Sequence, residues 1–101
     1  MATATNPHAL EKFVGMTLMN IAAAVDQIRS GAHPEYDGNC RRDIGDNLAL
    51  VAATREEQLG LDPDYPVGLP VHIARLREDH LPADMPLGTL RRVRRFVVLP
   101  Q

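Results

Sequence analysis

The feature that most constrains the fold is the run from Phe13 to Val25, which contains no charged residue. One apolar stripe recurs here at the helical spacings of three and four residues: Leu10, Val14, Leu18, Ile21, Val25 and Ile28. A second set lies off this stripe: Phe13, Met16, Met19 and Ala23. A helix that is apolar on more than one side needs cover from more than one neighbour. The second set therefore predicts either a partner surface or a face covered by other parts of the chain.

Capping residues predict the ends of two long helices. Asn6 is a good helix cap, Pro7 suits a first helical position and Gly31 suits a left-handed stop, so we expect a helix over residues 7–30. A loop with Pro34 and the turn pair Asp37-Gly38 should follow, then a helix over residues 39–59 with Gly60 as its stop. Gly45 weakens the interior of that helix by roughly 1 kcal/mol relative to alanine. Two long helices with a short connection predict an antiparallel hairpin.

Prolines divide the rest of the chain into short pieces, because proline ends helices and restrains the residue before it. We expect a short helix over residues 70–79 that buries Ile73 and Leu76. A last helix should begin near Pro86 or Thr89 and end near residue 97, with extended residues before Pro100. The predicted fold is one all-α domain over residues 1–101: a hairpin over 7–59, a proline-rich connector with two short helices over 60–97, and an extended tail over 98–101.

Composition supports a helical fold and a reducing environment. Only 4% of the 101 residues are aromatic and none is Trp, so the core must come from aliphatic side chains and methionine, which favours helices. The single cysteine, Cys40, excludes an internal disulfide framework and predicts a cytoplasmic location. Ten arginines against one lysine, Lys12, with abundant alanine, are typical of a GC-rich bacterial or phage genome.

The charge-free run has some features of an export signal, because Ala22 and Ala24 have the spacing of a cleavage site. Glu11 and Pro7 upstream lack the positive character of such a signal, and Thr17 interrupts the apolar run. Crossing a membrane takes about 20 apolar residues. We therefore expect neither a signal peptide nor a membrane span.

Positive charge is concentrated near the C-terminus. Residues 1–90 hold 7 basic and all 13 acidic side chains, a net charge of −6, while the remainder carries +4. The basic cluster is Arg91, Arg92, Arg94 and Arg95, on the side of the last helix opposite Leu90, Val93, Phe96 and Val97. These guanidinium groups suit phosphates or carboxylates. Pairing with the chain's own acidic surface, or simple solvation, is the preferred interpretation, ahead of nucleic acid and of an acidic partner protein. The net charge of −2 for the whole chain argues against nucleic acid, because a dedicated binding domain usually has a basic excess.

Catalytic patterns are weak. Cys40 follows the hairpin loop residues His33, Tyr36 and Asp37, and a thiol at a helix start beside arginines can be reactive. Its place on the apolar stripe of Ile44 and Leu48 instead favours a buried core thiol. No metal is expected, because the spacings of His33 with Cys40 and of His72 with His80 match no zinc pattern. The carboxylates of the second helix do not converge on one point: Asp43 and Asp46 lie near its start, Glu56 and Glu57 near its end.

These observations predict a non-enzymatic protein-interaction module, a homodimer with Phe13, Met16, Met19 and Ala23 in its interface and no cofactor. Methionine suits such a surface because its side chain adapts to a partner. The first alternative is a small nucleic-acid-binding regulator that uses the Arg91–Arg95 face. The second is an enzyme that uses Cys40 or the carboxylates. His33, Tyr36 and Asp37 are a candidate recognition loop.

Overall fold

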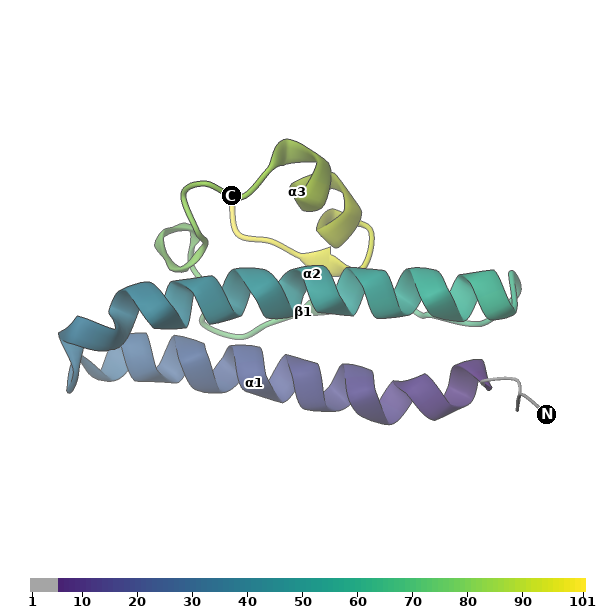
Figure 1. Ribbon diagram of the computed structural model, residues 1–101, viewed down its shortest axis with the longest axis horizontal. Helices are drawn as coiled ribbons and strands as arrows, with labels where there is room; N and C mark the ends of the chain where they lie inside the picture. Colours follow the sequence, from purple (N-terminus) through teal and green to yellow (C-terminus); the bar gives the residue numbers. More distant parts are fainter. Residues whose placement is uncertain (1–5) are drawn as a thin grey trace.

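Two long antiparallel helices, α1 (Glu11–Ser30) and α2 (Asp37–Leu61), dominate the computed structural model, which describes residues 6–101 (Figure 1). The Asn6 side chain accepts a hydrogen bond from the backbone N–H of His8 at 2.9 Å and caps a short 3-10 turn, η1 (Pro7–Leu10), that leads into α1. Gly31 ends α1 in the left-handed conformation, at a φ of 66°. The predicted all-α hairpin is confirmed. The helical segment covers residues 7–30 as predicted, but its first four residues form a 3-10 turn and the α-helix itself begins at Glu11.

The second helix is longer than predicted at both ends. A 3-10 turn, η2 (Pro34–Tyr36), runs directly into α2, so Asp37 and Gly38 form its first turn and not a loop. At the other end α2 continues through Gly60, and Asp62 is the first residue to leave the helix, with φ −147° and ψ 103°. The following residue, Pro63, disfavours a helical conformation at Asp62 and makes a glycine stop unnecessary.

The helix predicted over residues 70–79 is wrong. Strand β1 (Val71–His72) pairs in parallel with β2 (Val97–Val98), with Val71 opposite Val97. Arg75 has a φ of 67°, which interrupts any helix, and a 3-10 turn, η3 (Glu78–His80), follows. Pairing with a segment far along the chain therefore overrides the local pattern, although Ile73 and Leu76 are buried as predicted.

The last helix, α3 (Leu87–Arg94), ends before the predicted limit at residue 97. The reason is the same pairing: Phe96 accepts a backbone hydrogen bond from the N–H of Val71 at 2.9 Å, and this requires an extended chain after the helix. The predicted extended residues before Pro100 are confirmed. Val97 and Leu99 are both buried.

One core joins the hairpin to the C-terminal segment. Side chains from α1, α2 and residues 73–99 contribute to it: Val14, Ile21, Val25, Ile44, Leu48, Val51, Ala52, Ile73, Leu76, Val93, Phe96, Val97 and Leu99. In Figure 1, α3 lies on the side of α2 away from α1. The edge of α1 that points away from α2 therefore has no element beside it in this view. Across residues 6–101, no helix combines the length and apolar content needed to cross a membrane.

Candidate functional site

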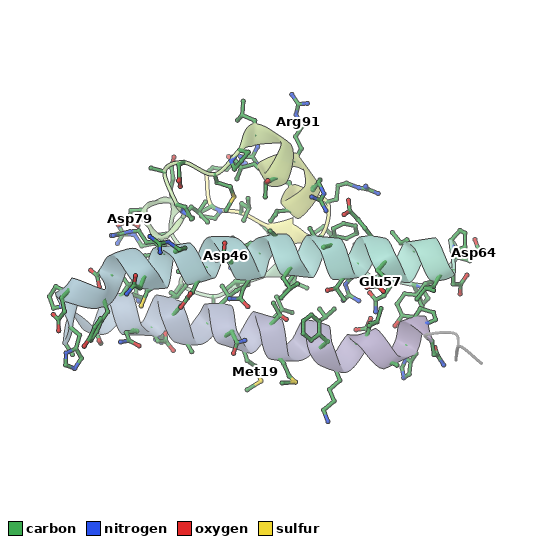
Figure 2. All side chains as sticks on the ribbon, viewed as in Figure 1. Met19, Asp46, Glu57, Asp64, Asp79 and Arg91 are labelled. Carbon is green, nitrogen blue, oxygen red and sulfur yellow. The ribbon has the colours of Figure 1, made fainter. Side chains whose placement is uncertain are left out.

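The apolar side of α1, comprising Phe13, Met16, Met19 and Ala23, is exposed. Phe13 is 42% exposed, Met16 55% and Met19 72%, and Ala23 is also exposed. Figure 2 shows Met19 projecting away from α2, on the edge of the molecule opposite Arg91. The C-terminal segment packs against the buried core residues of the hairpin. It leaves Phe13, Met16, Met19 and Ala23 in contact with solvent.

A polar network joins the N-terminal end of α1 to the C-terminal part of α2. One carboxylate oxygen of Glu11, Oε1, accepts hydrogen bonds from Gln58 Nε2 at 2.9 Å, from the Tyr65 hydroxyl at 2.8 Å and from Arg55 Nη1. Gln58 Nε2 also donates to the backbone oxygen of Pro7 at 3.0 Å, and its Oε1 accepts from Arg55 Nη1 at 2.9 Å. Gln58 is fully buried and Arg55 is 8% exposed.

This network holds Glu11 in its charged form. Burial alone raises the pKa of Glu11, but the hydrogen bonds from Tyr65, Gln58 and Arg55 outweigh burial and lower that pKa below its ordinary value. Burial and the same carboxylate raise the pKa of the Tyr65 hydroxyl. Because the donors converge on one oxygen, the arrangement suits a structural anchor better than a proton-transfer site. The sequence signal was two polar residues, Arg55 and Gln58, on the apolar stripe of α2, which sequence reasoning overlooked.

The four arginines of the C-terminal region have different surroundings. Arg92 Nε lies 3.2 Å from both carboxylate oxygens of Glu56 on α2, and its Nη2 also bonds to Glu56. The guanidinium of Arg95 lies 5.2 Å from the centre of the Phe96 ring, and Arg91 projects away from α2 (Figure 2). Arg94 and Val97 both line a shallow cavity beside β2. Self-pairing with the acidic surface therefore holds for Arg92, and the cluster is not a uniform cationic face.

The hairpin turn places the candidate recognition residues at one end of the molecule. The rings of His33 and Tyr36 lie 5.6 Å apart and are tilted by 46°, and His33 Nδ1 is 3.2 Å from a Glu35 carboxylate oxygen. Asp37 begins α2. The Oδ1 atom of Asp37 is buried and has no hydrogen-bond partner within residues 6–101. A carboxylate in the first turn of a helix is favoured by the helix dipole, which accounts for Asp37 at this position.

Cys40 is buried, at 8% exposure, as its place on the apolar stripe predicted. Burial raises the pKa of the Cys40 thiol, and the nearby carboxylates of Asp43 and Asp37 raise it further. A nucleophilic cysteine needs the opposite shift, because the thiolate is the reactive form. The surroundings of Cys40 give no support to a nucleophilic role.

The remaining candidate groups stay apart. Asp43, Asp46 and Glu57 are on the surface of α2, and Glu56 is paired with Arg92, whose hydrogen bond lowers the pKa of Glu56. Of the histidines, His72 is exposed on β1. His80 is buried, and its Nδ1 accepts the backbone N–H of Arg77 at 3.0 Å. Burial lowers the pKa of His80. In the part of the chain the structure describes, no three His, Cys, Asp or Glu side chains are grouped to hold a metal ion.

A cavity of about 550 Å³ is lined by the first half of α2 and by residues 82–89. Its lining mixes cationic, anionic and apolar side chains: Arg41, Arg42, Asp46, Asp84, Pro82 and Met85. Gly45 lies on its wall next to Pro82. The mixed lining does not select one chemical class of ligand.

No protein-family model matches this chain, no curated protein matches it in sequence, and no solved structure matches it.

Proposed function

We propose that this protein is a non-enzymatic interaction module that forms a homodimer through the apolar side of α1 and acts as an adaptor, inhibitor or regulator. The observation that carries the proposal is the exposure of Phe13, Met16 and Met19 on a helix whose opposite side is already buried in the core. Contiguous exposed apolar side chains are typical of protein interaction sites. Methionine is well suited to them because its flexible thioether side chain adapts to the surface it contacts.

The experiment is sedimentation velocity over a concentration series from about 5 to about 500 µM, a range suited to the weak association of small interfaces. We expect a monomer–dimer equilibrium for the wild type and a monomer for Met19→Glu. The matched control is Leu69→Glu, which changes another exposed apolar residue, 88% exposed, far from α1 in the sequence. A monomer throughout the series overturns the homodimer. A Met19→Glu variant that dimerises as the wild type does overturns this face as its interface.

A nucleic-acid-binding regulator is the second candidate, and Arg91 supports it because its side chain projects away from the body of the protein (Figure 2). The pairing of Arg92 with Glu56 weakens this candidate, because it removes one cation from the face. Binding to duplex DNA and RNA is measured in a salt series, with Arg91→Ala and Arg94→Ala combined. Affinity that falls with salt and with this variant supports the candidate, and no affinity at low salt overturns it.

A further inference from the structure

A stripe along the outer edge of α1 carries an internal symmetry. It consists of Lys12, Gly15, Met16, Met19, Ala22, Ala23 and Asp26, spaced by three and four residues, and all of these are exposed. At about 100° per residue they fall within an arc of roughly 120° on the helix. We call these residues the symmetric stripe. Phe13 lies beside this stripe, about 60° around the helix from Met16, and so flanks the contact between two helices packed along it.

The midpoint of the symmetric stripe is Met19. Lys12 and Asp26 lie at equal distances before and after it, as do Gly15 and Ala23. Two copies of α1 laid antiparallel with their Met19 residues in contact therefore place Lys12 of each copy opposite Asp26 of the other. Gly15 of each copy then opposes Ala23 of the other, and this pair of small residues favours a close approach of the two helices at that point.

Charge distinguishes this arrangement from the parallel one. A parallel pairing in the same register places Lys12 on Lys12 and Asp26 on Asp26, so both contacts are repulsive. The antiparallel pairing makes both contacts attractive. None of the ion pairs formed within residues 6–101 involves either of these two side chains, so neither is already committed within its own chain.

Gly15 is consistent with close packing of a second helix, because its own chain places no atom near this position. Glycine in a helix interior is less favourable than alanine. At Gly45 the structure gives a reason for it, because an added Cβ would lie 2.5 Å from Pro82 Cγ. At Gly15 an added Cβ would have nothing within 4 Å, so packing inside the chain does not require glycine there. A second helix packed along the symmetric stripe would give Gly15 such a role.

We propose that the partner of α1 is a second copy of this chain, bound antiparallel across a two-fold axis at Met19, with two reciprocal Lys12–Asp26 ion pairs. This inference rests on the proposed homodimer and specifies its geometry. The symmetric stripe is much smaller than the 20 to 30 residues per side of a standard interface. The dimer is therefore weak and depends on concentration.

Charge reversal tests the register. Lys12→Asp alone, or Asp26→Lys alone, turns both attractive contacts into repulsive ones, and we expect the dimer to weaken about tenfold at low salt. The double variant Lys12→Asp/Asp26→Lys restores both attractions and should restore the wild-type dissociation constant. The differences should shrink in about 1 M salt, where charges are screened within a few ångströms. In a parallel dimer each single reversal only replaces one like-charge contact by another, so the single variants keep the wild-type dissociation constant, and that result overturns the proposal.

Cross-linking tests the position of the axis. In a Cys40→Ala background, Met19→Cys places two thiols at the two-fold axis, within the short range that a disulfide requires. Met16→Cys is the matched control, because in this register it faces Ala22 of the second copy, and the two introduced thiols are roughly 9 Å apart along the helix. We expect oxidation to give a covalent dimer for Met19→Cys and not for Met16→Cys.

The outcomes separate the geometry from the function it rests on. If the wild type dimerises but the dissociation constant does not rise in the single charge variants and return in the double variant, the antiparallel register is overturned. Equal cross-linking of Met19→Cys and Met16→Cys overturns it too. Either result leaves the proposed homodimer standing. A wild type that stays monomeric overturns both. Gly15→Gln is a further check, since it places a long side chain on the symmetric stripe with no clash inside its own chain. It should strengthen the monomer's helix and weaken the dimer, and an unchanged dimer contradicts close approach at Gly15.

Discussion

Replacing Gly45 by alanine tests how the C-terminal segment packs against the hairpin. Gly45 is a buried residue of α2, and an added Cβ would lie 2.5 Å from Pro82 Cγ, 3.1 Å from Pro82 Cδ and 3.3 Å from Met85 Cε. The methionine tip can rotate away. The proline ring cannot, because it is closed onto the backbone, so residues 82–85 must shift as a segment.

Two opposing effects set the magnitude. Alanine is favoured over glycine in a helix interior by about 1 kcal/mol. Forcing a methyl group into a filled site costs about 1–3 kcal/mol. Gly45→Ala should therefore lower the free energy of unfolding by up to about 2 kcal/mol. Gly15→Ala, where an added Cβ has open space, should instead raise it by about 1 kcal/mol.

The assay is urea unfolding followed by far-ultraviolet circular dichroism, at a low protein concentration so that the monomer is measured. A double-mutant cycle with Pro82→Ala identifies the clashing group, and we expect a coupling of about 0.5–3 kcal/mol because the smaller side chain makes room for the methyl group. The reasoning is refuted if Gly45→Ala stabilises the protein as much as Gly15→Ala does.

Three further predictions concern the polar network around Glu11 and the thiol of Cys40. Gln58→Leu should lower the free energy of unfolding by about 1–3 kcal/mol in the same assay. The substitution leaves the backbone oxygen of Pro7 and the guanidinium of Arg55 with fewer hydrogen-bond partners. An unchanged free energy of unfolding would contradict a stabilising role for the polar network. The lowered pKa of Glu11 means that its contribution to stability is present above the unfolded-state value near 4.5 and is lost as pH falls through the lower folded-state value. Glu11→Gln should flatten thermal stability against pH in that acidic window, and a profile as steep as the wild type's would argue against it. The Cys40 thiol should react with a thiol reagent far more slowly in the folded protein than in urea, since it is buried and its pKa is raised; equal rates at neutral pH would show that it is accessible.

The hairpin could be predicted from sequence because its signals are local. Asn6 and Pro7 mark the start of the first helix, Gly31 marks its end, and the apolar stripe between them has the helical period. Each of these acts within a few residues of its own position. Gly45 is a partial exception, since the sequence shows it as a weak point of the helix. Its reason, the close approach of Pro82, depends on a distant segment.

The C-terminal segment and the polar network could not be predicted in the same way. Val71 and Ile73 fit a short helix as well as a strand, and the pairing of Val71 with Val97 decides between them. Gln58 was overlooked because a polar residue on an apolar stripe looks like an interruption, although it donates a hydrogen bond to Glu11. In both cases the deciding partner is far away in the sequence, and no local period encodes it.

The parallel pairing of β1 with β2 has a consequence for the order of folding. The hairpin closes through the short connection between Ser30 and Asp37, whereas the pairing of Val71 with Val97 encloses all of η3 and α3. Closing a longer loop costs more chain entropy, so contacts of large sequence separation form later. We therefore expect the hairpin to form first, with its core residues partly exposed to water until Val97 packs against them. In native-state hydrogen exchange, amides of the paired strands should open at lower free energy than those in the middle of α2, as a cooperative unit separate from the hairpin.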